Sequence, residues 1–291
     1  MFVQHNTVSS CLDYVKSRLE NQFSLTEIRQ IQRQIFEKIF AWSPAQLMLN
    51  NDYRLTESEL LLVRDFVKRL KNNEPLQYIM GYTEFCDLKI LCDSRALIPR
   101  PETEELVYKI LEYNKTNTAE TKILDLCTGS GCIALALKSK WDQAAVTGVD
   151  VSIEALQLAQ KNAESLNLSV SWLKEDVLQL ADANVLKTQK WDVIVSNPPY
   201  IPEKDKSMMA SNVLDFEPHL ALFVDNKQPI IFYQRIIEFA KGQLKNDGLL
   251  AFELHENLAN EVKEACSQNG FSAVEIFEDL QGKSRMLVAR I

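Results

Sequence analysis

The chain has little glycine, little histidine and no long apolar run. Of its 291 residues, 8 are glycine and 3 are histidine. No apolar run approaches the roughly 20 residues that a membrane-spanning helix needs, and no apolar stretch follows a basic start, so we expect no membrane span and no signal peptide. The 6 cysteines include no C-x-x-C pair, which excludes the usual zinc motifs and a dense disulfide framework. We therefore expect a reduced, cytoplasmic protein without a metal site.

Positive charge is also in deficit. Lysine and arginine total 32 against 40 aspartate and glutamate, which gives a formal charge of −8. Non-specific nucleic-acid binding depends on basic side chains that contact phosphates, so we expect no direct binding to nucleic acid. With 46% hydrophobic residues the chain can bury a core, and its length suggests roughly two domains.

Residues 1–80 carry helical patterns and no recognisable chemistry. Apolar residues recur at helical spacing over residues 28–40. Ser43 followed by Pro44 indicates a helix N-terminus, and Thr56 begins a capping box before an apolar face over residues 60–70. We predict a small helical bundle that serves packing or interaction.

The segment 81–102 is predicted to be a linker with a hairpin. The helical period is lost over residues 84–98, and apolar residues over 85–91 and 96–98 indicate short strands. Cys92-Asp93-Ser94 lies between them and is the predicted turn.

From residue 103 to residue 291, short apolar runs alternate with helical stretches. This pattern predicts an α/β domain with a parallel sheet covered by helices on both faces. The last two runs, 273–277 and 285–289, are separated only by a loop, which predicts an antiparallel pair at the sheet edge. The other expected strands are Ile123–Leu126, Val146–Val149, Val170–Leu173, Val193–Ser196 and Leu249–Leu254, and the expected helices include Ile153–Leu166 and Pro229–Leu244.

Two scarce glycines mark the end of the first of these strands. The strand leads into Cys127-Thr128-Gly129-Ser130-Gly131, where glycines allow a tight turn and close approach to a ligand. Asp150 ends the next strand and can accept hydrogen bonds from ribose hydroxyls. An ordinary strand-to-helix turn with an incidental aspartate is the alternative interpretation. The spacing is not G-x-G-x-x-G, and Asp125 would repel a pyrophosphate but can pair with an amino group. S-adenosylmethionine (SAM) therefore fits best.

The fourth strand ends in Asn197-Pro198-Pro199-Tyr200. A planar NH₂ group is a poor nucleophile, because its lone pair is delocalised. The Asn197 side-chain oxygen and the Pro198 carbonyl can accept both of its N–H hydrogens and aim the nitrogen at a methyl group. Tyr200 offers an aromatic face to a planar amide or base. Asn-Pro-Pro is also an ordinary turn signal, but its place beside the glycine turn favours catalysis.

Together these segments resemble a known family. Residues 98–104, 125–132 and 197–200 closely resemble the peptide chain release factor glutamine N5-methyltransferases, the PrmC/HemK family. The resemblance extends from about Glu74 to the C-terminus and includes Phe216-Glu217-Pro218 and residues 282–285.

The resemblance implies a class I SAM-dependent methyltransferase: a Rossmann-like, mostly parallel seven-stranded sheet over 103–291, behind a helical substrate-recognition domain over 1–80. The implied substrate and partner is a class 1 release factor, methylated on the glutamine of its Gly-Gly-Gln loop. The resemblance assigns Cys127, Thr128, Gly129, Ser130, Gly131, Asp150, Val177 and Asn197 to SAM, and Asn197, Pro198, Pro199 and Tyr200 to the glutamine, with Asn197, Pro198 and Tyr200 catalytic.

Two positions depart from the family pattern. Val177 stands where an aromatic residue is common, and Cys127 stands where many relatives have glycine. We therefore expect the backbone at Cys127 to suit a non-glycine residue. Three alternatives stay open: a glutamine of a ribosomal protein as substrate, an adenine amine as substrate, and a SAM-binding scaffold without activity.

Overall fold

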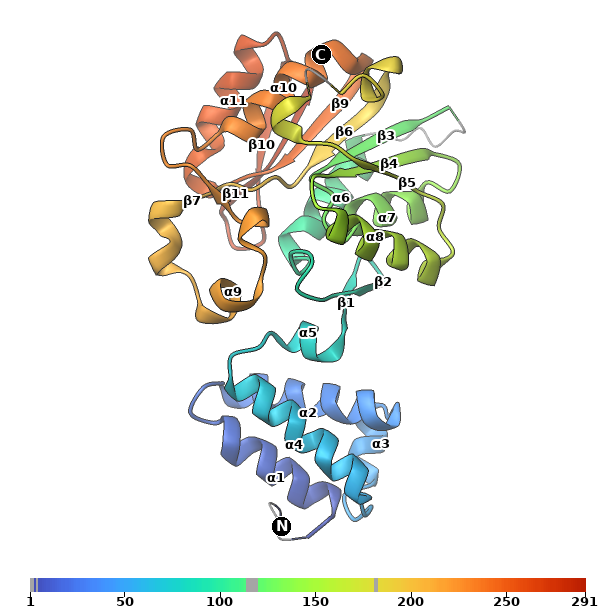
Figure 1. Ribbon diagram of the computed structural model, residues 1–291, viewed down its shortest axis with the longest axis vertical. Coiled ribbons are helices and arrows are strands. Elements are labelled where there is room, and N and C mark those ends of the chain that lie inside the picture. Colours follow the sequence, from blue (N-terminus) through green and yellow to red (C-terminus); the bar gives the residue numbers. More distant parts are fainter. Residues whose placement is uncertain (1–2, 4, 114–119, 181–182) are drawn as a thin grey trace. The chain divides into compact units, whose positions relative to one another are not determined.

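The computed structural model describes residues 3, 5–113, 120–180 and 183–291. The chain divides into two compact units (Figure 1). The first comprises residues 1–81 together with α9 (Ser211–Phe216), and the second comprises residues 82–210 and 217–291. The helix α9 thus groups with the first unit, although it lies within the range 103–291 that the sequence assigns to the second domain.

The first unit is helical, as predicted, and its helices begin at residues that cap them. Thr56 forms the predicted capping box, in which the side chain and the third helical residue exchange hydrogen bonds with backbone amides. Ser43 caps its helix before Pro44 as predicted, and it also forms a capping box. Ser24 forms a third. The helices are α1 (Val8–Leu19), α2 (Leu25–Phe40), α3 (Pro44–Leu49), α4 (Glu57–Lys71) and α5 (Leu76–Met80).

The predicted apolar faces of this unit are buried. On α4 every expected core residue from Leu60 to Leu70 is buried. On α2 the residues at the start of the predicted face are buried and the last two, Ile39 and Phe40, are half-buried; the buried ones are Ile28, Ile31, Ile35 and Phe36. Helical spacing places these side chains on one face of each helix, so each face packs against the others and leaves its charged residues in solvent.

The second unit begins with a β-hairpin whose turn has two residues. Strands β1 (Tyr82–Phe85) and β2 (Leu88–Leu91) pair antiparallel, and Cys86 and Asp87 form the turn with φ of +48° and +67°. The sequence placed this turn at residues 92–94, which is wrong. Two consecutive residues with positive φ match the twist of a hairpin, but the usual signal for such a turn is Asn-Gly or Asp-Gly, and Cys-Asp does not give it.

The main sheet has seven strands in the order β10-β11-β9-β6-β3-β4-β5. Strand β11 runs antiparallel to β9 and β10, and the other pairs are parallel. This confirms the Rossmann-like methyltransferase sheet and the antiparallel pair at its edge. The strands are β3 (Lys122–Leu126), β4 (Ala145–Asp150), β5 (Ser171–Lys174), β6 (Trp191–Ser196), β9 (Leu244–Glu253), β10 (Ser272–Glu278) and β11 (Ser284–Arg290), and a short pair is formed by β7 (Ile201–Pro202) and β8 (Phe223–Val224).

Helices bury both faces of this sheet (Figure 1). Alternate residues of each strand point to opposite faces. Leu124 and Ile194 therefore pack with α10 (Ile231–Gln243) and α11 (Ala259–Gln268). Ile123 and Val193 pack with the helices on the opposite face. With both faces covered, the strand ends are left to form a site. The other helices are α6 (Pro101–Tyr113), α7 (Cys132–Lys140) and α8 (Ile153–Leu166), and 3₁₀ turns span η1 (Val177–Gln179), η2 (Leu186–Thr188), η3 (Glu203–Met208), η4 (His219–Ala221) and η5 (Glu256–Leu258).

A buried carboxyl group holds the turn that follows β3. Asp125 has no exposed surface, and its Oδ2 accepts hydrogen bonds from the Thr128 hydroxyl at 2.5 Å and from the Ala134 amide at 3.2 Å. These two bonds join β3 to the turn and to the start of α7. Burial raises the pKa of Asp125 to about 7.

The Asp125→Asn variant is expected to change how stability depends on pH. Because the pKa of Asp125 rises from 3.8 to about 7 on folding, the folded protein binds more protons than the unfolded chain between these values. The free energy of unfolding therefore falls as pH rises through this range, by at most about 1.4 kcal/mol per pH unit. Asparagine cannot ionise, so the variant gains stability relative to the wild type as pH rises from 5 to 8.

Urea unfolding followed by tryptophan fluorescence measures this difference, since Trp141, Trp172 and Trp191 all lie in the second unit. The exposed Glu261→Gln on α11 is the matched control and should leave the wild-type pH profile unchanged. Parallel profiles for wild type and Asp125→Asn would contradict the prediction.

Candidate active site

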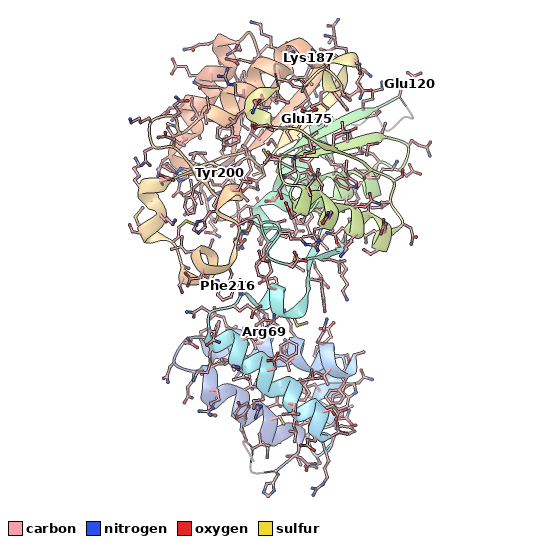
Figure 2. All side chains as sticks on the ribbon, viewed as in Figure 1. Arg69, Glu120, Glu175, Lys187, Tyr200 and Phe216 are labelled. Atoms are coloured by element: carbon pink, nitrogen blue, oxygen red, sulfur yellow. The ribbon has the colours of Figure 1, made fainter. Side chains whose placement is uncertain are left out.

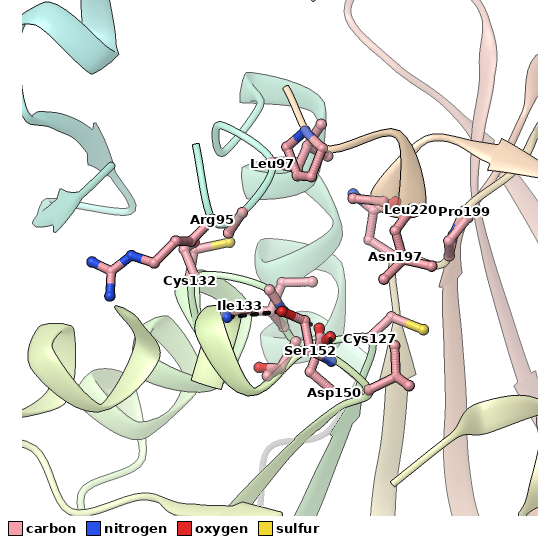
Figure 3. A pocket seen from close by; sticks show the side chains of 18 of the residues that line it. Arg95, Leu97, Cys127, Cys132, Ile133, Asp150, Ser152, Asn197, Pro199 and Leu220 are labelled. Carbon is pink, nitrogen blue, oxygen red and sulfur yellow. Dashed lines mark hydrogen bonds between the residues drawn. The ribbon is translucent and has the colours of Figure 1, made fainter. Parts of the chain in front are cut away.

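One cavity of about 230 Å³ lies at the carboxyl edge of the parallel strands (Figure 3). Figure 3 shows Cys127 and Asp150 together on one side and Asn197 with Pro199 on the other, while Arg95 points away from them. Of the residues that the sequence predicted, the cavity is lined by Cys127, Thr128, Gly129, Ser130, Asp150, Val177, Asn197 and Pro199. Gly131, Pro198 and Tyr200 are not among its lining residues.

The parallel register brings these residues together. Leu126 of β3 lies beside Val149 of β4 on one side and Ser196 of β6 on the other. The Ser196 hydroxyl donates to the Leu126 carbonyl at 2.6 Å, and the Thr128 amide donates to the Val149 carbonyl at 2.9 Å. The residues that follow these three strands therefore leave the sheet at one edge.

Asp150 is held by backbone amides at the end of β4. Its Oδ2 accepts from the Gly129 amide and its Oδ1 from the Ser152 amide, both at 2.9 Å. Each carboxylate oxygen has a further lone pair, so Asp150 can still accept hydrogen bonds from a ligand in the cavity. Burial raises the pKa of Asp150, and its backbone hydrogen bonds partly oppose that effect.

Apolar side chains form the wall next to Asp150. Val177 is buried at the start of η1, and the neighbouring Val151 and Leu178 line the same cavity with 41% and 39% of their surface exposed. The Asp176 side chain fixes this turn by accepting from the Leu178 amide at 2.9 Å. Exposed apolar atoms beside a carboxylate suit a flat, apolar ring attached to a hydroxylated sugar.

The backbone at Cys127 contradicts the sequence prediction. Its φ of +60° lies in the left-handed region, which costs a residue with a Cβ roughly 1–2 kcal/mol. The expectation that this position suits a non-glycine residue was wrong, because the chain must turn sharply where β3 ends. Burial raises the pKa of the Cys127 thiol well above its usual range, so the thiol stays protonated.

Gly131 has a packing role that the sequence did not reveal. Its φ is +81°, and a Cβ there would lie 2.7 Å from the ring of Trp172. Gly148 is under the same constraint, since a Cβ would lie 2.3 Å from that ring. Trp172 of β5 thus fills the space that both glycines leave, and a contact between Gly131 and SAM stays a prediction.

Asp125 does not line the cavity either. The hydrogen bonds that Asp125 Oδ2 accepts come from the turn and from α7, so the structure gives this residue a structural role. The pairing of Asp125 with an amino group of a ligand stays a prediction.

The side chain of Tyr200, labelled in Figure 2, is engaged elsewhere in the second unit. Its hydroxyl donates to Glu253 Oε1 at 3.0 Å, and its ring packs edge-on against His255 with 6.0 Å between centroids. The stacking of this ring on a substrate amide stays a prediction.

Sequence reasoning missed Thr103 and Glu253. Asn197 Nδ2 donates to Thr103 Oγ1 at 3.3 Å, and the Thr103 hydroxyl donates to Glu253 Oε2 at 2.5 Å. Both residues are buried. A signal was present, because Glu253 is a charged residue that ends the apolar run of β9.

A loop forms a further part of the cavity wall. Residues 96–98 were predicted to form a strand, which is wrong: they are irregular and line the cavity. Glu217 holds this loop, since its Oε2 accepts from the Ile98 amide at 3.0 Å and its Oε1 from Arg100 at 2.5 Å. The Glu217 side chain is 1% exposed. Sequence reasoning assigned no role to the segment 98–104 or to Glu217-Pro218. The contact gives both a role, because Glu217 holds the loop in place.

Two further findings concern the described residues only. Among them, no group of three or more histidine, cysteine, aspartate or glutamate side chains could hold a metal ion. No helix within the described ranges is long and apolar enough to cross a bilayer.

Comparison with known proteins agrees with the fold. A model described as the PrmC N-terminal domain matches residues 10–81, and a methyltransferase small domain model matches residues 104–216. The solved T. thermophilus 16S rRNA N2 G1207 methyltransferase, in complex with AdoMet and guanosine, superimposes with a TM-score of 0.52 at 18% identity, over 72% of this chain and 49% of that one. At that identity the likeness shows the fold alone.

Two curated relatives extend over nearly the whole chain. The release factor glutamine methyltransferase of Flavobacterium psychrophilum is 38% identical over 92% of this chain and 94% of its own length. That of Bacteroides thetaiotaomicron is 36% identical over 95% and 97%. With this similarity over both units, the chain belongs to the family of release factor glutamine methyltransferases.

Proposed function

We propose that this enzyme transfers the methyl group of SAM to the side-chain amide nitrogen (N5) of the glutamine in the Gly-Gly-Gln motif of class 1 release factors, in the cytoplasm. The observation that carries the proposal is that a single cavity is lined by both Asp150 and Asn197. A carboxylate suited to ribose and an amide suited to an NH₂ group thus face the same space. The relatives named release factor glutamine methyltransferase support this substrate.

The residues present fit SAM. The Asp150 carboxylate would accept hydrogen bonds from the ribose hydroxyls, and the apolar wall of Val151, Val177 and Leu178 would cover the base. The turn from Cys127 to Ser130 would face the remainder of the SAM molecule. When bound, SAM supplies a methyl group activated by a positively charged sulfur.

Asn197 and Pro198 would prepare the acceptor nitrogen. An amide NH₂ has two hydrogens in one plane, and the Asn197 Oδ1 and the Pro198 carbonyl would accept one each. These bonds fix the position of the nitrogen and favour pyramidal geometry, so that its lone pair points at the methyl group. The nitrogen loses a proton easily once it is methylated, so no strong general base is needed.

Methylation of a release factor is the direct test. Unmethylated class 1 release factor is incubated with the enzyme and SAM and is then examined by intact-mass measurement and peptide mapping. We expect the gain of one methyl group on the Gly-Gly-Gln peptide, because residues suited to SAM and a residue suited to the glutamine amide line the same cavity.

A release factor with Gln→Ala in this motif is the control and should gain nothing. If the wild-type factor gains no methyl group although the enzyme binds SAM, the substrate assignment is wrong. Ribosomal protein and adenine acceptors are then tested in the same assay.

The Asn197→Ala variant is expected to separate binding from catalysis. Alanine removes one of the two acceptors for the substrate amide but leaves Asp150 and the apolar wall in place. We expect SAM affinity within about threefold of wild type and a fall in methyl transfer of roughly 100-fold or more. Calorimetry measures the first quantity and a transfer assay the second.

The exposed Asn260→Ala on α11 is the matched control. Wild-type transfer by Asn197→Ala would rule out the proposed role of this side chain.

Glu217 variants test the loop that closes the cavity. Glu217→Ala removes the acceptor for both the Ile98 amide and Arg100, whereas Glu217→Gln keeps one neutral acceptor. We expect methyl transfer to fall by about tenfold or more for alanine and by less for glutamine, because the loop then no longer holds its position. The readouts are SAM affinity and transfer rate, with the exposed Glu203→Gln as control. Equal activity of Glu217→Ala and wild type would show that the loop needs no such anchor.

A further inference from the structure

A chain of hydrogen bonds extends from the cavity into the core of the second unit. It begins at Asn197 Nδ2, passes through the Thr103 hydroxyl and ends at the carboxylate of Glu253, which also receives the Tyr200 hydroxyl. Thr103 lies in the first turn of α6 and is 2% exposed, and Glu253 ends β9 and is 1% exposed. Asn197 and Thr103 also line the cavity.

Hydrogen-bond direction is determined along this chain. Each oxygen of Glu253 accepts from one hydroxyl group, Oε2 from Thr103 and Oε1 from Tyr200, so the single hydroxyl hydrogen of Thr103 is committed to Glu253. The Thr103 oxygen is then left as an acceptor, and the atom of Asn197 that faces it must be the NH₂ group. The other branch of that amide, Oδ1, is consequently free to accept.

We propose that Thr103 and Glu253 are positioning residues that fix which way the Asn197 amide faces, so that its oxygen is presented to the N–H of the methyl acceptor. The proposal rests on the proposed function, in which Asn197 accepts from the substrate amide. A reversed amide would present its own NH₂ to the substrate NH₂, and two donors cannot bond to each other.

The contacts of Glu253 hold its carboxyl group in a fixed position. Each carboxylate oxygen has one hydroxyl donor. Burial raises the pKa of Glu253, while the hydrogen bonds from Thr103 and Tyr200 and the positive charge of Arg285 oppose that effect. The backbone at Glu253 is held as well, because the buried Tyr233 hydroxyl donates to its carbonyl at 2.9 Å.

Fold stability alone does not explain a carboxylate at this position. An ionised group in the interior carries a desolvation cost that an amide of the same shape avoids. Glutamine could fill the space of Glu253 and hydrogen-bond Thr103, but its NH₂ could also donate to the Thr103 oxygen. The Thr103 hydrogen would then be released to donate to Asn197 Oδ1, which reverses the amide. The carboxylate is the group that excludes this arrangement.

Variants of both residues test the proposal. We expect Glu253→Gln and Thr103→Val to fold and to bind SAM within about threefold of wild type, with kcat lower by about tenfold or more. Thr103→Ser, which keeps the hydroxyl, should lose clearly less than Thr103→Val. The exposed Thr188→Val and Glu261→Gln are matched controls. A kcat of Thr103→Val within about twofold of wild type would overturn the proposal.

A second readout separates this proposal from the proposed function. In protein labelled with ¹⁵N at asparagine side chains, the Asn197 NH₂ signal is assigned by its loss in Asn197→Ala. We expect this signal to shift in Thr103→Val and Glu253→Gln and not in the controls. A shift in an enzyme that fails to methylate release factor supports the positioning pair and rejects only the substrate. An unchanged signal in Thr103→Val rejects the positioning pair.

Discussion

The site depends on the parallel register of β4, β3 and β6. Parallel strands have their carboxyl ends at the same edge, so the residues that follow three neighbouring strands meet there even though Cys127, Asp150 and Asn197 are far apart in the sequence. Hydrogen bonds at the strand ends strengthen this arrangement, since the Ser196 hydroxyl and the Thr128 amide each bond to the neighbouring strand. A register shift of one residue would exchange the side chains on the two faces of a strand, so the packing of the core on both faces, which selects the register, also fixes the site.

Unfavourable local features are concentrated around this edge. Cys127 has a left-handed backbone, and the carboxyl groups of Asp125 and Glu253 are buried. Each costs stability. Hydrogen bonds within the same region offset part of this cost for the two carboxyl groups: Thr128 and Ala134 bond to Asp125, and Thr103 and Tyr200 bond to Glu253. The helical unit shows the opposite pattern, because its capping boxes and apolar faces agree with local propensity. Such conflicts between local preference and fold are expected where a site is built.

This contrast explains what the sequence could predict. Periodicity and capping are local, so the helices and the alternation of strands and helices followed from them, and so did the residues that end β3, β4 and β6. The turn at Cys86 was missed because neither of its residues signals positive φ. Thr103 and Glu253 were missed for another reason: they are 150 residues apart, and only the packing of α6 on the end of β9 makes them partners. Contacts of this kind cannot be predicted from any short segment of the sequence.

The two halves of the cavity differ in how much they specify. On the cofactor side a carboxylate and an apolar wall together suit a nucleoside. On the acceptor side, the proposed amide oxygen of Asn197 would accept from an N–H in a plane, and this feature is common to a glutamine side chain and to an adenine amine. In the proposed function, Asn197 therefore sets the geometry of transfer and not the identity of the substrate. Choice of a protein over a nucleic acid must come from surfaces outside the cavity, and a formal charge of −8 disfavours a phosphate backbone there. Chemistry and selectivity are thus assigned to different parts of this enzyme, so the same site can serve different acceptors in related folds.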